Sequence, residues 1–89
     1  MIVLFNPWSS PSKKKPLPMS LLAIGSMLEG EFDYQIVDGN LAADPVGVIL
    51  AMAEKTPLTA IAVTVMPGPQ LRAAVMGCRQ LKRILPWVP

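Results

Sequence analysis

Apolar and polar residues come in alternating blocks along the chain, and the blocks predict strands and helices in turn. Three blocks are short runs of mostly apolar residues, and the first, "MIVLF", is continuously apolar, a pattern typical of a strand buried on both faces. These runs cover residues 1–5, 34–37 and 58–65. In three other blocks the apolar residues recur every three or four positions, which indicates amphipathic helices. The helical blocks cover residues 19–30, 45–56 and 70–85.

The ends of the predicted helices carry residues that commonly start and stop helices. Gly30 suits the C-terminus of the first helix, because glycine readily adopts a positive φ. Asp44 is the expected N-cap of the second helix, and Pro45 takes its first position, where the missing amide costs nothing. Pro57 closes the second helix and Pro86 ends the third.

The alternation of strand and helix predicts an α/β fold. Its core is a parallel three-stranded sheet in the order 2-1-3, flanked by the helices. At 89 residues the chain is at most one small domain, yet 52% of it is apolar and only 16% is charged. We therefore expect residues 1–89 to be the incomplete N-terminal part of a domain. Its apolar faces would be covered by the remainder of that domain or by a homo-oligomer.

Charge and cysteine content narrow the classes of protein to consider. The net charge of +2 is slight and gives no reason to expect a nucleic-acid partner. A single cysteine, Cys78, forms no internal disulfide, and the chain has no histidine, so no metal-ligand set is expected. A reducing cytoplasm is the simplest compartment. The uncharged run over residues 16–28 is shorter than the roughly 20 residues that span a bilayer, so no membrane span is expected.

Ligands of open parallel sheets bind beyond the carboxyl ends of the strands, and three unusual loops are predicted at that edge. They cover residues 6–16, 38–40 and 64–70. The second loop offers the carboxylate of Asp38 and the amide of Asn40 on either side of a glycine. The first loop supplies its binding candidates directly after the strand, namely Asn6, Pro7, Trp8, Ser9 and Ser10.

The third loop joins a strand to a helix through a rigid stretch that is poor in side chains. Pro67 and Pro69 fix φ and remove amide donors, while Gly68 lets a flat ligand approach the backbone closely. The alternative is a tight turn in which the prolines only limit chain entropy. The binding candidates of this loop are Thr64, Val65, Met66, Gly68, Pro69 and Gln70.

Three stretches of the chain resemble the N-terminal cobalamin-binding domain of the cobalamin-dependent radical SAM family. They read "VLFNPWSSPSKKKPLPMSLLAIGSMLE", "YQIVDGN" and "AIAVTVMPGPQLRAA". The family typically has an Asn-Pro-Pro-type loop, a Pro-Leu-Gly-Leu-type helix start and a Ser-Met-Thr-Gly-Gln-like end to the third strand. The corresponding positions here are residues 6–8, 16–19 and 64–70, and the resemblance covers nearly the whole chain.

The resemblance implies a flavodoxin-like (Rossmann-like) domain that holds a cobalamin corrin over the carboxyl edge of its sheet. The expected function is the cobalamin-binding module of a radical SAM enzyme of methyltransferase or cyclase type, without catalytic residues of its own. S-adenosylmethionine and an iron–sulfur cluster would belong to a downstream radical SAM domain, since the CxxxCxxC motif is absent here. The Asp-x-His-x-x-Gly motif is absent too, so no imidazole of this chain ligates cobalt.

Two other functions remain open on the sequence. One is a ligand-free flavodoxin-like interaction or regulatory domain, and the other is a nucleotide-binding half-domain of another enzyme. The residues after the first strand, Asn6 and Pro7, offer no acidic cluster of the kind that a phosphorylated receiver domain uses. No GxGxxG motif follows that strand to indicate a dinucleotide. A three-cysteine motif downstream of Pro89 would discriminate in favour of the radical SAM assignment.

Overall fold

Three strands and three helices alternate along the chain, in the order that the sequence predicts. The computed structural model describes residues 1–9 and 19–89. The elements are β1 (Ile2–Asn6), α1 (Met19–Leu28), β2 (Tyr34–Asp38), α2 (Pro45–Lys55), β3 (Ala60–Val63) and α3 (Pro69–Ile84).

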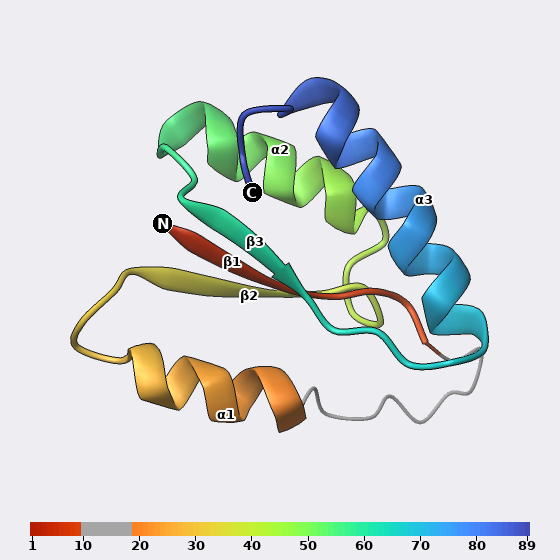
Figure 1. Ribbon diagram of the computed structural model, residues 1–89, viewed down its shortest axis with the longest axis horizontal. Helices are drawn as coiled ribbons and strands as arrows, with labels where there is room; N and C mark the ends of the chain where they lie inside the picture. The colour runs from red at the N-terminus through yellow and green to blue at the C-terminus, as the bar shows by residue number, and fades with distance from the viewer. Residues whose placement is uncertain (10–18) are drawn as a thin grey trace.

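The strands form one parallel sheet in the order β2-β1-β3, which confirms the predicted topology (Figure 1). The central strand β1 has the same length as its predicted apolar run but lies one residue later, from Ile2 to Asn6, because Asn6 pairs with Asp38 in register. Strand β3 is shorter than predicted. Its pairing with β1 ends where Val63 lies beside Phe5.

The helices cover the two faces of the sheet unequally. Helices α2 and α3 lie together over one face, and α1 lies alone over the other (Figure 1). The main core lies under α2 and α3. It consists of Val3, Phe5, Val37, Ile49, Leu81, Leu85 and Val88. Leu4 points to the opposite face from Val3 and Phe5, since neighbouring strand residues alternate, and Leu21 of α1 is likewise buried.

The predicted helix ends are confirmed. The Asp44 side chain caps α2 by accepting a hydrogen bond from the Gly47 amide (3.1 Å), and Pro45 is the first helical residue. Gly30 follows α1 with φ of +83°, a conformation that favours glycine. Gly68 precedes α3 with φ of +101°, also in the range that favours glycine.

The apolar stripes of α1 and α3 are less buried than their spacing predicts. On α3, Leu71 and Val75 remain 49% and 43% exposed, and β3 is the edge strand of the sheet, with no further strand beside it among the described residues. On α1, Ile24 and Met27 remain 44% and 81% exposed. None of the helices in the described part of the chain has both the length and the apolar character that a membrane crossing needs.

Candidate functional site

The carboxyl edge of the sheet brings described residues of all three predicted loops together at the start of α3. The segments that follow β1 and β3 run toward the first turn of α3 (Figure 1). The side-chain amide of Gln70, in that first turn, donates hydrogen bonds to Asn6 Oδ1 (2.8 Å) and to the Pro7 carbonyl (3.0 Å). The first loop and the helix after the third strand are therefore tied to each other.

Asn6 is the centre of a short relay of side chains across all three elements. Its Nδ2 donates to Asp38 Oδ1 (3.0 Å) while its Oδ1 accepts from Gln70. A carboxylate only accepts hydrogen bonds, so Asp38 fixes which way the Asn6 amide faces. Asn6 in turn requires Gln70 to present its nitrogen, and the orientation of both amides follows from the carboxylate.

The second loop is tied to the first by backbone and side-chain bonds. Asp38 Oδ1 also accepts from the Asn40 amide (3.0 Å), and Asn40 Oδ1 accepts from the Ser9 backbone amide (3.0 Å). The Gly39 amide donates to the Asn6 carbonyl (2.7 Å). A Cβ on Gly39 would lie 2.7 Å from the Trp8 backbone nitrogen, so the two loops touch at a position where only glycine fits.

These contacts show that most polar candidates of the first two loops are occupied within the chain. Asn6, Asn40 and Gln70 are buried, with exposed fractions of 6%, 8% and 4%. Their side chains hold the loops in place. Sequence reasoning placed them at one edge of the sheet, where the structure also has them, but periodicity carries no information on the bonds between them.

One buried polar atom in this network has no partner among the described residues. It is Gln70 Oε1, on the same side-chain amide whose nitrogen donates to Asn6 and Pro7. An unpaired buried acceptor costs about 1–3 kcal/mol. Turning the Gln70 amide over would exchange its oxygen and nitrogen. The orientation that Asp38 imposes on Asn6 prevents this, because Asn6 Oδ1 needs a donor from Gln70.

The loop between β3 and α3 differs from the other two because its side chains are exposed. Val65 and Met66 are 47% and 63% exposed, and Pro67, Gly68 and Pro69 are exposed as well. Thr64 Oγ1 lies 3.4 Å from Ser20 Oγ at the start of α1, a contact that the sequence analysis missed. No signal in the sequence pairs these two hydroxyls, which are 44 residues apart.

Gly68 is required for backbone geometry and also leaves open space. Its φ of +101° and ψ of −147° lie in a region that is essentially restricted to glycine. Among the described residues, no heavy atom lies within 4 Å of a Cβ built on Gly68. The loop thus presents bare backbone to the outside, next to Met66 and the prolines.

The remaining candidates of the first loop divide into a buried and an exposed residue. Pro7 is among the fully buried side chains, whereas Trp8 is 39% exposed. Ser9 belongs to the bonded network through its contact with Asn40. Ser10 lies outside the residues that the structure describes.

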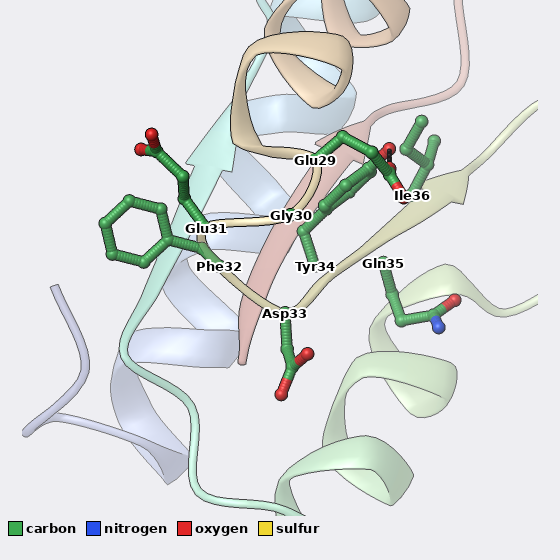
Figure 2. Close-up of a pocket in the computed structure, with 8 residues that line it drawn as sticks. All are labelled: Glu29, Gly30, Glu31, Phe32, Asp33, Tyr34, Gln35 and Ile36. Atoms are coloured by element: carbon green, nitrogen blue, oxygen red, sulfur yellow. Dashed lines mark hydrogen bonds between the residues drawn. The ribbon is translucent and has the colours of Figure 1, made fainter.

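A separate hollow of about 640 Å³ lies at the other end of the sheet, around the turn from α1 into β2 (Figure 2). Its lining includes the carboxylates Glu29, Glu31 and Asp33. The Tyr34 hydroxyl donates to Glu29 Oε2 (2.8 Å), and this hydrogen bond, with slight desolvation and the Glu29 charge, raises the pKa of Tyr34. Within residues 1–9 and 19–89, no group of three acidic, cysteine or histidine side chains is arranged to hold a metal ion.

Comparisons of the chain with protein-family models, with curated proteins and with solved structures find no match. The geometry of the carboxyl edge therefore carries the functional argument. At this edge the buried side chains are hydrogen-bonded to one another, and beside them lies an exposed loop rich in proline and glycine, residues 64–69.

Proposed function

We propose that the chain is the cobalamin-binding module of a radical SAM enzyme of methyltransferase or cyclase type. The observation that carries the proposal is the exposed loop over residues 64–69, in which Gly68 has open space above its backbone. The loop lies beyond the carboxyl end of a parallel strand, where open α/β sheets bind their ligands.

The residues around this loop fit a large flat ligand with an apolar face. Met66, Pro67 and Pro69 offer exposed apolar atoms, and the two prolines restrict the loop so that little entropy is lost on binding. Trp8, which follows β1 at the same edge of the sheet, adds an exposed ring that suits stacking. The internal hydrogen bonds of Asn6 and Gln70 keep this surface preorganised.

Cobalamin bound at this edge would supply a cobalt centre that carries a methyl group or exchanges electrons. The chain's own contribution is to bind and orient the corrin, since it has no histidine to ligate the metal from below. Asn6 and Asp38 support the loops through their mutual hydrogen bonds, while Gln70 keeps one side-chain oxygen unpaired among the described residues.

The proposal places the chain within a larger enzyme in the cytoplasm. Residues 1–89 would form the N-terminal part of a flavodoxin-like domain, and its remainder would add to the open edge of β3. A downstream radical SAM domain would hold S-adenosylmethionine and the iron–sulfur cluster. The exposed stripes of α1 and α3 are the surfaces available for these neighbours.

The experiment compares hydroxocobalamin binding by the protein and by two matched variants, followed by visible absorbance. Met66→Glu places a charge in the proposed corrin surface, and we expect the dissociation constant to rise at least tenfold, about 1.4 kcal/mol. Met76→Glu makes the same change on α3, where the side chain is similarly exposed (56% against 63%), and should bind like the parent. Circular dichroism checks that both variants fold.

Equal affinity in the parent and in folded Met66→Glu would contradict the proposed site, and no binding by the parent would contradict the function. Gly68 is a poor choice for this test. Any side chain at its φ of +101° strains the backbone, so lost binding would not distinguish steric contact from a rearranged loop.

A ligand-free interaction or regulatory domain is the second candidate. The observation that favours it is the exposed apolar surface on α1 and α3, together with the internal pairing of Asn6, Asn40 and Gln70. This function predicts normal folding and no cobalamin binding at any concentration.

A further inference from the structure

The short segment after α3 is anchored beside the edge strand β3. The Pro89 carbonyl accepts a hydrogen bond from the Ile61 amide of that strand (2.9 Å). Val88 is only 4% exposed and belongs to the main core. The Lys82 ammonium donates to the Val88 carbonyl (2.7 Å), and the Val88 amide donates to the Leu85 carbonyl (3.1 Å). Three hydrogen bonds and one buried side chain therefore hold this segment against the sheet.

The hydrogen bonds of β3 identify the backbone groups that its edge leaves open. Directly after the strand, the Thr64 amide donates to the Phe5 carbonyl of β1 (3.1 Å). The Ile61 amide instead points away from β1, toward Pro89. Neighbouring strand residues direct their backbone groups to opposite sides, so the amide and carbonyl of Val63 also face away from β1. In the described part of the chain no further strand lies beside these groups.

The placement of the helices indicates on which side of β3 a following strand belongs. Crossovers between parallel strands almost always have the same hand, so a helix on a given face moves the chain in one direction along the sheet. Helix α2 connects β2 to β3, across β1, and α3 lies on the same face as α2 (Figure 1). Helix α1, on the opposite face, moves the chain the other way, from β1 to β2. A strand after α3 therefore lies beyond β3, where Pro89 already makes its bond.

We propose that the polypeptide following Pro89 continues as a fourth strand, which pairs in parallel with the open edge of β3. This inference rests on one part of the proposed function, namely that the domain extends beyond residues 1–89, and it does not depend on cobalamin. The Pro89 bond sets the register. The second residue after Pro89 donates to the Ile61 carbonyl and accepts from the Val63 amide. A strand from a second copy fits this edge less well, because it has to displace Pro89 first.

The register also assigns the side chains of the fourth strand to the two faces of the sheet. The first and third residues after Pro89 lie beside Ile61 and Val63 and, like Val88, point toward the main core. A mostly apolar hollow of about 140 Å³ lies on this face. Its lining consists of Ile61, Val63, Cys78, Leu81, Lys82, Leu85, Val88 and Pro89. Apolar side chains at these two positions fill the hollow, and burial of their surface stabilises the pairing.

The fourth strand adds a further loop to the carboxyl edge of the sheet. Because it runs parallel to β3, its carboxyl end reaches the same edge as the exposed loop over residues 64–69. The loop that follows it then borders Val65 and Met66 on the side away from β1. Ligands of open parallel sheets bind in the crevice beyond the carboxyl ends of the strands, so this loop shares in the binding surface.

The test is amide hydrogen exchange, followed by NMR without cobalamin, on the protein and on extended forms of it. The first extended form carries a short stretch of alternating valine and threonine after Pro89, beginning with valine. We expect the Val63 amide to exchange rapidly in the parent protein and at least tenfold more slowly in this form. The Ile61 amide should be protected in both, because Pro89 already accepts its hydrogen bond.

Two further forms, matched in composition, test the register with a single proline in the extension. Proline at the second residue lacks the N–H that donates to the Ile61 carbonyl and places its ring against that oxygen, so the protection of Val63 should be lost. Proline at the third residue, whose nitrogen faces away from β3, should preserve the protection, since the outer side of an edge strand tolerates proline.

A Val63 amide that stays unprotected in the first extended form would overturn the proposal, and so would equal protection in the two proline forms. Protection of Val63 in the parent protein that rises with protein concentration would assign the edge to a second copy, and would also overturn it. Failure here is distinguishable from failure of the proposed function. An unprotected Val63 contradicts the fourth strand alone, whereas absence of hydroxocobalamin binding contradicts the cobalamin module alone.

Discussion

The two ends of the sheet both carry clusters of polar residues, but the two clusters differ in burial and in hydrogen bonding. At the carboxyl end, Asn6, Asp38 and Gln70 bond to one another and are largely withdrawn from water. At the amino end, Glu29 and Glu31 surround an open hollow and are exposed. The hydrogen bonds at the carboxyl end hold its loops in place, and the exposed loop over residues 64–69 lies at that same end.

The difference shows that a polar residue in a loop is not by itself a ligand contact. Asn6 and Gln70 were predicted as binding residues, and the structure instead shows them bonded within the chain. That these two residues contribute to ligand binding stays a prediction. Their contribution would come through the loops that they hold in place. Met66 and Trp8 are among the exposed binding candidates that could meet a ligand directly.

The largest expected effect is the loss of stability in Asn6→Ala. This change leaves the Gln70 amide and the Asp38 carboxylate each without one hydrogen-bond partner, and Gln70 is buried. We expect the free energy of unfolding to fall by about 2–3 kcal/mol in urea denaturation. Glu31→Gln, an exposed change at the amino end, should alter stability by less than about 0.5 kcal/mol. Similar losses in both variants would mean that the polar residues at the two ends contribute equally to stability.

The second expected effect is a loss of stability at two glycines. One is required by a close contact and the other by its backbone conformation. In Gly39→Ala the new methyl lies 2.7 Å from the Trp8 backbone nitrogen, which cannot easily move, and we expect a loss of about 1–3 kcal/mol. In Gly30→Ala at the amino end, the new methyl meets no atom of the described residues within 4 Å. Only the strain of the positive φ then lowers the free energy of unfolding, by about 1 kcal/mol. Thermal unfolding of both variants shows which one loses more stability. A larger loss in Gly30→Ala than in Gly39→Ala would contradict the tight contact between the two loops.

The smallest effect concerns the pKa of Tyr34 at the amino end. The hydrogen bond to Glu29, followed by desolvation and the Glu29 charge, raises this pKa above its ordinary value of 10.0. Because the folded-state pKa is raised, the contribution to stability is complete below the unfolded pKa and is lost as pH rises through the folded pKa. A phenolate absorbance titration should show the Tyr34 transition moving to lower pH in Glu29→Ala. An unchanged transition would mean that the bond is not formed in solution.

The order and direction of the elements could be predicted because local signals decide them. The Asp44 cap, the proline after it and the glycine after α1 lie within a few residues of the ends they specify. The parallel sheet follows from alternation of strand and helix, and the central position of β1 fits its continuous apolar run.

Burial and the bonding of the candidate site could not be predicted in the same way. The stripe of α3 has the spacing of a buried face, but whether Val75 is covered depends on a strand beyond β3. The bond from Gln70 to Asn6 joins residues 64 positions apart, and no local pattern encodes it. The positive φ of Gly68 was not predicted either, because the sequence argument for this glycine rested on its missing side chain.

The central claim is that the carboxyl edge, rather than the acidic hollow, binds cobalamin. The most direct measurement is the amide NMR spectrum of the isotope-labelled protein during titration with hydroxocobalamin, whose cobalt(III) is diamagnetic. We predict saturable shifts for the amides of Val65, Met66 and Gly68 and for the indole of Trp8, with little change over residues 29–33. The absence of shifts, or shifts confined to residues 29–33, would contradict the account.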